Sequence, residues 1–113
     1  NIVTNNIAKP IDVIWGAVDN AAMGAANALE LAGAEGTIVV SAGAWGSEPF
    51  GMINNNHKYY KMCIGVSAAN IVKATLESVQ KYFKGEEVPR NQNIELAVID
   101  ATNIADYMKY VQQ

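Results

Sequence analysis

The sequence predicts an α/β fold built on a parallel sheet with helices on both faces. An apolar run over residues 11–16 leads into an alanine-rich helical segment, residues 19–32, and a second apolar run, residues 37–41, follows. Strand, helix and strand in this order form a parallel βαβ unit. The alternation continues as β-α-β-α-β-α-β-α along the 113-residue chain. This pattern is typical of a sheet whose faces are covered by its own crossover helices.

The first helix has clear start and stop signals. Residues 1–10 are polar and irregular and lead into the first strand. Asp19 is expected to cap the helix, because a carboxylate there accepts the free N–H groups of the first turn and complements the helix dipole. Gly33 is expected to end it in the left-handed conformation. Small apolar residues at helical spacing predict a face that packs closely on the sheet: Ala22, Ala26 and Leu29.

The middle of the chain combines turn-rich segments with a third strand. A glycine-rich loop over residues 42–51 follows the second strand and leads to a short helix near residues 50–54. Residues 54–57 are expected to form a turn, since asparagine tolerates positive φ, and we expect His57 to be a solvated side chain there. The third strand is predicted over residues 58–66.

A second long helix is predicted over residues 67–84. Ser67 is the expected cap, and Gly85 is expected to end the helix. Apolar residues spaced by four, three and four predict one buried stripe on it: Val72, Leu76, Val79 and Phe83. A fourth strand over residues 94–99 and a short helix near residues 103–110 complete the predicted elements.

Composition excludes several classes of protein. Eight basic and eleven acidic side chains give a net charge of −3, which offers no electrostatic footprint for DNA or RNA. No apolar stretch reaches the roughly 20 residues of a membrane helix. The single Cys63 cannot form an internal disulfide and is expected to be a small buried hydrophobe. One cysteine and one histidine cannot make a conventional zinc site, and no dinucleotide fingerprint or Walker loop is present. We therefore expect a protein that is not an enzyme and needs no metal or cofactor.

The candidate site lies at the carboxyl ends of the strands, where open α/β sheets bind ligands. Four predicted loops end there: residues 17–20, 42–51, 66–69 and 100–103. They carry five candidate site residues: Asp19, Trp45, Glu48, Val66 and Ser67. Trp45 fits either stacking on a flat ligand or packing over the end of the sheet. Glu48 fits either a ligand contact or a charge at a helix start, and Trp15 is expected in the core.

Three stretches of the sequence resemble one known family. Residues 11–16 (Ile-Asp-Val-Ile-Trp-Gly), followed by Asp19-x-x-Ala-x-Gly-Ala-x-x-Ala-Leu-x-x-Ala-Gly33, are similar to the C-terminal region of the type I periplasmic binding proteins for sugars. The turn over residues 83–89 (Phe-Lys-Gly-Glu-Glu-Val-Pro) and the ending over residues 96–104 (Leu-Ala-Val-Ile-Asp-Ala-Thr-Asn-Ile) also resemble the family. The resemblance covers the chain from about residue 10 onward.

The resemblance implies the C-terminal part of a two-lobe fold that closes like a hinge over one small ligand. In this family the ligand is usually a monosaccharide, which is passed to a membrane permease for ATP-driven import. The chain would be about the last third of such an extracytoplasmic protein, periplasmic or lipid-anchored at the cell surface. Residues 1–66 would belong to the C-terminal lobe, 67–93 to a hinge crossover with a helix that packs on the N-terminal lobe, and 94–113 to the closing strand and helix. Without that upstream lobe, the helix would expose its apolar stripe.

Site residues follow from the same resemblance. Asp19 matches the ligand-binding aspartate of the family, whose carboxylate accepts sugar hydroxyls in charge-assisted hydrogen bonds. Val18, Val66 and the segment 42–44 stand where the family often has polar side chains. A ligand with fewer hydroxyl groups, or a partly apolar one, is therefore implied.

Two other classes of protein remain open on the sequence. The first is the effector-binding lobe of a sugar-responsive transcription repressor, which shares the fold. The second is a stand-alone α/β domain of the flavodoxin or receiver type. The ending over residues 100–104 and the turn over residues 85–89 favour the transport class.

Overall fold

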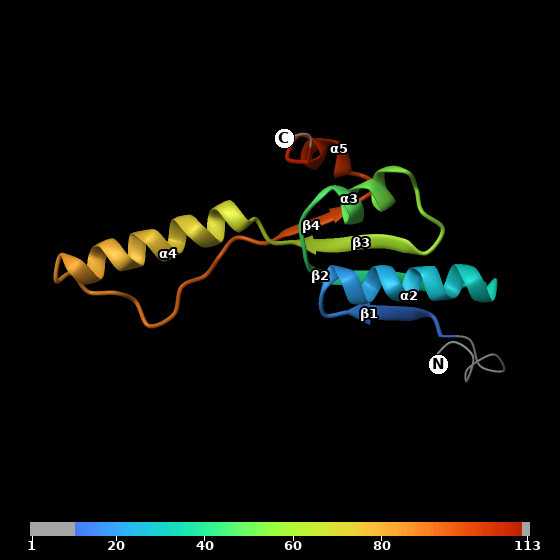
Figure 1. Cartoon of the computed structure of the whole chain (residues 1–113), viewed down its shortest axis with the longest axis horizontal. Helices are drawn as coiled ribbons and strands as arrows, with labels where there is room; N and C mark the ends of the chain where they lie inside the picture. Colours follow the sequence, from blue (N-terminus) through green and yellow to red (C-terminus); the bar gives the residue numbers. More distant parts are fainter. Residues whose placement is uncertain (1–10, 112–113) are drawn as a thin grey trace.

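The computed structural model describes residues 11–111 and contains the predicted alternation of strands and helices (Figure 1). The strands are β1 (Val13–Gly16), β2 (Ile38–Ala44), β3 (Tyr60–Gly65) and β4 (Ala97–Asp100). The helices are α2 (Asp19–Ala32), α3 (Ser47–Asn54), α4 (Ala68–Phe83) and α5 (Ile104–Met108). The irregular segment expected over residues 1–10 lies outside the described residues, as do residues 112 and 113.

The four strands form one mostly parallel sheet in the order β1-β2-β3-β4, which confirms the predicted α/β class. β1 and β3 both run parallel to β2, whereas β4 is antiparallel to β3. Gly65 at the end of β3 therefore pairs with Ala97 at the start of β4. As a consequence, the chain leaves the sheet for α4 and returns from it at the same edge.

One face of the sheet is covered by α2, α3 and α5. α2 contacts the first three strands, while α3 packs on β3 and α5. The fully buried side chains of this layer include Leu29, Val39, Phe50 and Ile99. Close packing depends on small residues, since a Cβ added to Gly16 would lie 2.7 Å from the Cβ of Ala22. Burial of one large aliphatic or aromatic side chain contributes roughly 1.5–3 kcal/mol, so this layer holds the lobe together.

The opposite face of the sheet is bare within residues 11–111. We call it the open face, and define it by the apolar alternate strand residues Val13, Trp15, Ile38, Val40, Met62, Ile64 and Val98. Asp100, which pairs with Met62, lies on the same face. Four of these apolar side chains are 39–63% exposed: Val13, Trp15, Ile38 and Val98. Trp15 is the most exposed of them. The expectation that Trp15 lies in the core is wrong, because strand alternation turns it away from α2. Parallel sheets are normally covered on both faces, so this surface is unusual.

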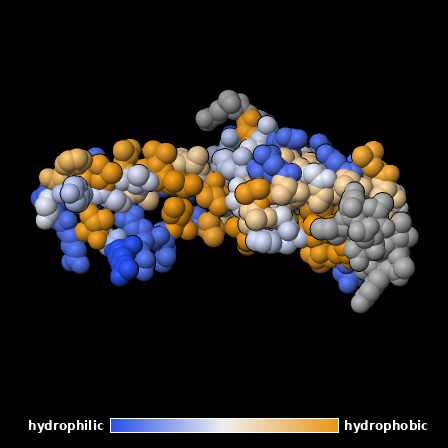
Figure 2. Space-filling view, turned by 60° about the horizontal axis from the view of Figure 1, so that its bottom comes forward, coloured by the Kyte–Doolittle hydropathy of each residue, from blue (hydrophilic) through white to orange (hydrophobic). Residues whose placement is uncertain are grey.

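α4 projects from the lobe and stretches the molecule to 60 × 29 × 19 Å (Figure 1). None of its residues is buried, and its apolar stripe of Val72, Leu76, Val79 and Phe83 is 44–81% exposed. Figure 2 shows hydrophobic side chains along this projecting arm. The expectation that the stripe is buried is therefore wrong for this chain.

Most helix ends follow the predicted signals. Gly33 ends α2 with φ 60°, and Gly85, which follows the end of α4, has φ 71°. The Ser67 hydroxyl accepts a hydrogen bond from the N–H of Asn70 at 3.5 Å and so caps α4. The predicted loop over residues 42–44 is instead part of β2. Gly43 adopts φ 66°, and the pairing with β3 shifts between Ser41 and Ala44, so the strand continues through an irregularity.

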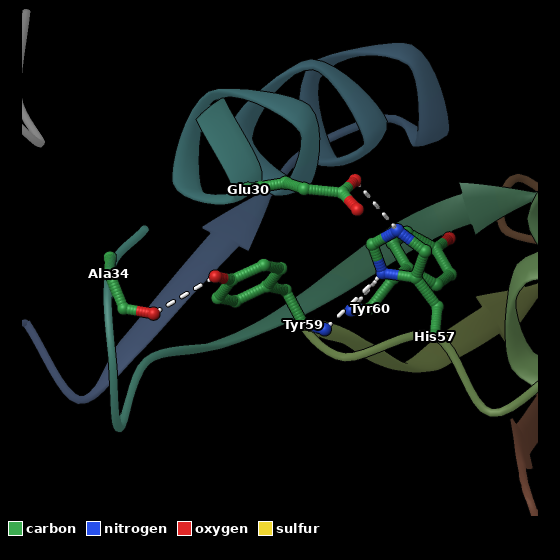
Figure 3. Close-up of polar contacts among 5 residues, drawn as sticks. All are labelled: Glu30, Ala34, His57, Tyr59 and Tyr60. Carbon is green, nitrogen blue, oxygen red and sulfur yellow. Dashed lines mark hydrogen bonds and ion pairs between the residues drawn. The ribbon is translucent and has the colours of Figure 1, made fainter. Parts of the chain in front are cut away.

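His57 is a structural link rather than the solvated side chain that the sequence suggests (Figure 3). Its Nδ1 accepts hydrogen bonds from the backbone N–H groups of Tyr59 and Tyr60, both at 3.2 Å. Its Nε2 lies 3.7 Å from a carboxylate oxygen of Glu30 on α2. The Tyr59 hydroxyl donates to the carbonyl of Ala34 at 2.9 Å. These contacts fix the beginning of β3 against the end of α2, at the opposite end of the sheet from the candidate site.

Candidate functional site

The carboxyl ends of β1, β2 and β3 meet at one edge of the sheet, which we call the carboxyl edge. The N–H of Val66 donates to the carbonyl of Ala44 at 3.2 Å and joins the ends of β2 and β3. A Cβ added to Gly43 would lie 3.8 Å from the carbonyl oxygen of Ala17, so the ends of β1 and β2 also approach closely. The predicted convergence is confirmed for the loops that follow β1, β2 and β3. It is wrong for residues 100–103, because β4 is antiparallel to β3 and Asp100 pairs with Met62 near the start of β3, at the opposite end of the sheet.

Asp19 is the first residue of α2 and stands at the end of β1. Its Oδ1 accepts a hydrogen bond from the N–H of Asn20 at 2.8 Å. The N-cap position is occupied by Val18, and no side-chain cap hydrogen bond is formed there. The expectation that Asp19 caps the helix is therefore wrong by one position. The carboxylate still complements the positive end of the helix dipole, and it is partly exposed.

A buried pair of hydroxyl groups lies near Asp19. The hydroxyl groups of Ser41 and Tyr60 are 2.6 Å apart, in hydrogen-bond contact. Burial raises the pKa of Tyr60 to about 12, and the nearby charge of Asp19 adds to the increase. Burial, reinforced by Asp19, likewise raises the pKa of the Cys63 thiol to about 11. At neutral pH the thiol is protonated, which matches the predicted structural role and excludes a nucleophilic thiolate.

Trp45 belongs to an aromatic cluster at the β2 end of the carboxyl edge. Its ring lies 5.4 Å from that of Phe50, 6.4 Å from Tyr107 and 5.6 Å from Tyr110, measured between centroids. A Cβ added to Gly65 would lie 3.3 Å from the indole ring, so the glycine makes room for it. Trp45 therefore packs over the end of the sheet, between β3 and the helices α3 and α5.

A cavity of about 490 Å³ lies beside this cluster. Trp45, Tyr107 and Tyr110 form its aromatic wall, and the connections to and from α4 close the other side with Ser67 and Leu96. Its size is within the range of small-ligand pockets. Packing and stacking are thus compatible for Trp45, since the residue both packs in the aromatic cluster and lines the cavity.

The structure brings some of the predicted site residues together and leaves others apart. Asp19, Trp45, Val66 and Ser67 all lie at the carboxyl edge. Only Trp45 and Ser67 line the cavity. Val66 is partly exposed in the two-residue connection between β3 and α4. Glu48 is exposed in the first turn of α3 and does not line the cavity.

Sequence reasoning missed the two tyrosines of the cavity wall. Tyr107 and Tyr110 are three residues apart at the end of the chain, and such a pair shares one face of a helical turn. That spacing was the available signal. It could not show that the turn folds back onto Trp45, because this contact joins segments more than 60 residues apart.

Two kinds of feature are absent from the part of the chain that the structure describes. Within residues 11–111, no group of three or more histidine, cysteine or acidic side chains is placed to hold a metal ion. No helix in the same part of the chain is both long and apolar enough to cross a membrane.

Solved structures of other proteins share this fold, whereas comparisons of the sequence alone find no match. No family model and no curated protein sequence matches the chain. Solved structures do match. An ABC transporter periplasmic solute-binding protein from Actinobacillus succinogenes with bound D-allose is 26% identical, with a TM-score of 0.82 over 95% of this chain and 36% of that one. A sugar ABC transporter protein from Yersinia enterocolitica is 23% identical, with a TM-score of 0.76 over 91% and 31% of the two chains.

A third solved structure agrees with these two. The binding protein of the arabinose ABC transporter from Shewanella, bound to α- and β-L-arabinofuranose, is 20% identical, with a TM-score of 0.74 over 99% of this chain and 37% of that one. The chain thus spans about a third of the length of the proteins that it resembles. The resemblance drawn from the sequence is confirmed, and this chain has the fold of a lobe of the type I periplasmic binding proteins.

Proposed function

We propose that this chain is part of an extracytoplasmic solute-binding protein that holds a sugar or a sugar-like molecule between two lobes for ABC-type import. One observation carries the proposal. Over 95% of its length the chain matches a protein solved with D-allose, and it keeps a partly exposed carboxylate, Asp19, at the carboxyl edge. The effector lobe of a transcription repressor remains the alternative, and no observation of the structure favours it.

Asp19 is proposed as the main polar ligand contact. One of its carboxylate oxygens accepts a hydrogen bond from Asn20, which holds the group in place and leaves acceptor capacity for ligand hydroxyl groups. Hydrogen bonds from hydroxyl groups to a carboxylate are charge-assisted and strong. Binding rather than catalysis is proposed, and this role requires neither a metal nor a cofactor.

The surroundings of Asp19 support a ligand with an apolar side. Val18 is 51% exposed next to Asp19, and Val66 stands at the end of β3 on the same edge. Such side chains favour C–H groups over hydroxyl groups. Trp45 and Glu48 are proposed as secondary contacts. Trp45 would present its face from the cavity, and Glu48 would approach from α3.

A second lobe is proposed to complete the site. Both connections of α4 lie at the carboxyl edge, which supports a role for residues 67–93 as a hinge crossover. In the intact protein the apolar stripe of α4 would pack on the upstream lobe, because an exposed amphipathic helix gains stability by burying its apolar side. A leader peptide with a lipid-attachment cysteine, and a membrane permease that receives the ligand, belong to the same proposal.

The experiment uses the intact protein that contains residues 1–113. Calorimetry would measure binding of D-allose, L-arabinose, D-galactose and 6-deoxy-D-galactose. We expect binding of at least one sugar, with the 6-deoxy sugar favoured over D-galactose. A hydrogen bond to a charged group is worth about 1.5–3 kcal/mol, so Asp19→Asn should weaken binding by about 10- to 100-fold.

Asp12→Asn is the matched control. Asp12 is an exposed aspartate that immediately precedes β1, at the end of the sheet opposite the carboxyl edge. Its substitution should leave the affinity unchanged. Equal effects of the two substitutions, or the absence of binding by any of the four sugars, would contradict the proposal.

A further inference from the structure

Ser41 and Tyr60 form a polar contact inside the core of the lobe. Their hydroxyl oxygens are 2.6 Å apart, and neither side chain is more than 1% exposed. A buried hydroxyl group without a hydrogen-bond partner costs free energy, so each of these two groups depends on the other. This chain alone buries both side chains, and their contact therefore does not depend on the upstream lobe.

The pairing of β2 with β3 changes register twice around this contact. The successive partners are Val39–Tyr60, Val40–Met62, Ser41–Cys63 and Ala44–Gly65. Between the first two pairs β3 has one extra residue, and between the last two pairs β2 has one extra residue. The second irregularity thus cancels the shift in register that the first one introduces.

The two irregularities decide which side chains face the core. In a regular strand, residues three apart point to opposite faces. Tyr60 and Cys63 are three apart, yet both are fully buried. Ser41 and Ala44 are also three apart, and both are buried. Without the extra residues, one member of each pair would point to the open face. The hydrogen bond between Ser41 and Tyr60 spans the irregularity in β3 and ends where the irregularity in β2 begins.

The irregularity in β2 lies at the carboxyl edge. Gly43 within it has φ 66°, a conformation that favours glycine. A Cβ added to Gly43 would lie 3.8 Å from the carbonyl oxygen of Ala17, so β2 comes close to the end of β1 there. Trp45 follows two residues later and lines the cavity. Irregular strand positions are concentrated next to functional sites, where they redirect side chains.

Asp19 lies near the same pair of hydroxyl groups. Ser41 is paired with Gly16, the last residue of β1, and Asp19 follows Gly16 by three residues. Burial raises the pKa values of Tyr60 and Cys63, to about 12 and about 11, and the charge of Asp19 adds to both increases. The buried pair is therefore close to the proposed ligand contact as well as to the irregular part of β2.

We propose that Ser41 and Tyr60 are positioning residues of the sugar site, because their hydrogen bond fixes the two irregularities and so holds the end of β2 beside Asp19. The inference rests on the proposed function, which puts the ligand at this edge. Both side chains are too deeply buried to touch the ligand. Loss of either hydroxyl group leaves the other without its partner, which favours rearrangement of the irregular segment. Since a shift of one residue turns strand side chains to the opposite face, the end of β2 would then present other groups to the sugar.

Tyr59 and Tyr60 form a matched pair for the test. Both are buried and both use their hydroxyl group in a hydrogen bond, but that of Tyr59 goes to the carbonyl of Ala34, at the end of the sheet opposite the carboxyl edge. The experiment uses the intact protein that contains residues 1–113. Tyr59→Phe and Tyr60→Phe should lower its melting temperature to a similar extent, because each removes one buried hydrogen bond.

Only the variants of the buried pair should weaken sugar binding. Calorimetry would use the tightest-binding sugar among D-allose, L-arabinose, D-galactose and 6-deoxy-D-galactose. Tyr60→Phe and Ser41→Ala should each lower its affinity by about three- to tenfold, whereas Tyr59→Phe should leave it unchanged. The double variant of Ser41 and Tyr60 should lose no more affinity than the weaker-binding single variant, because both substitutions remove the same hydrogen bond.

Amide hydrogen exchange without sugar tests the structural step by itself. Tyr60→Phe and Ser41→Ala should speed exchange in residues 42–46, and Tyr59→Phe should not. Gly43→Ala strains the irregularity without removing a hydroxyl group, and it should have the same two effects as Tyr60→Phe. Gly36→Ala is its control, since Gly36 has φ 77° at the opposite end of the sheet. Circular dichroism checks folding, and the glycine pair provides the comparison if a core variant does not fold.

The proposal is overturned if Tyr60→Phe keeps the wild-type affinity, or if Tyr59→Phe weakens binding as much as Tyr60→Phe does. Weaker binding without faster exchange in residues 42–46 also overturns it, because the effect would then not pass through β2. A wild-type protein that binds none of the four sugars contradicts the proposed function. The exchange comparison still decides this inference in that case, and unchanged exchange in residues 42–46 of Tyr60→Phe would overturn it.

Discussion

α2 and α4 are the two long helices of the chain, and they have opposite environments. α2 is rich in alanine, and it buries Ala22, Met23, Ala26 and Leu29 against the sheet. α4 has the larger apolar side chains along its stripe and buries none of its residues. An amphipathic pattern thus predicts that a helix needs a partner surface, but it does not say in which polypeptide segment that surface lies.

The largest expected difference comes from removing a leucine in each helix. Leu29→Ala in α2 should cost about 2–5 kcal/mol of unfolding free energy, because it leaves a cavity in the core. Leu76→Ala in α4 should cost less than about 1 kcal/mol, since that side chain is mostly exposed. Urea unfolding at a concentration where the chain is monomeric would compare them. Equal losses would mean that α4 is packed as tightly as α2.

Two glycine substitutions test how closely α2 packs on β1. Gly16→Ala should destabilise the protein by about 1–3 kcal/mol, because the new Cβ would lie 2.7 Å from the backbone nitrogen of Ala22. Gly24→Ala should stabilise α2 by up to about 1 kcal/mol, since apart from the backbone of its own helix and its two chain neighbours no atom lies within 4 Å of the new Cβ. Thermal unfolding gives both values, and two changes of the same sign would contradict the packing described for α2.

Alkaline pH should lower the free energy of unfolding of the lobe. The pKa of Cys63 rises from 9.0 to about 11 and that of Tyr60 from 10.0 to about 12 on folding. Both groups are neutral in the folded protein at pH 8, and the unfolded chain loses these protons first as the pH rises. Stability should therefore fall from about pH 9 and keep falling until about pH 12. Urea titrations at pH 8, 10 and 11 would show this, and a flat profile would contradict the burial of the two groups.

The smallest expected effect is at the start of α4. Ser67→Ala removes the cap hydrogen bond and should cost about 0.5–1 kcal/mol of helix stability. Because α4 is separate from the core, the loss should appear as faster amide exchange in the first turns of α4 and not in α2. Faster exchange in both helices would mean that they unfold together.

Much of the fold follows from local sequence signals. The order of strands and helices, the left-handed Gly33 and the cap at Ser67 depend on neighbouring residues, and the structure agrees with them. Exposure of Trp15 and of the α4 stripe could not be predicted from periodicity, because burial depends on what covers a surface. His57 was misjudged because its hydrogen bonds require the exact backbone path into β3.

The candidate site was predictable in place but not in detail. Parallel strands put Asp19, Trp45 and Val66 at one edge, and the sequence pattern is sufficient for that inference. The direction in which Trp45 packs depends on contacts with α5 that no local signal reveals. The one-position error at Asp19 arises because a carboxylate satisfies the helix dipole equally well at the cap and in the first turn.

The central functional claim is that ligand binds at the carboxyl edge, and hydrogen exchange of the intact protein with and without D-allose tests it most directly. We expect the sugar to slow exchange in residues 17–20, 43–46 and 66–70, with no change around residues 33–37 and 55–59 at the opposite end of the sheet. Protection confined to the opposite end, or binding with no protection at the carboxyl edge, would contradict the account.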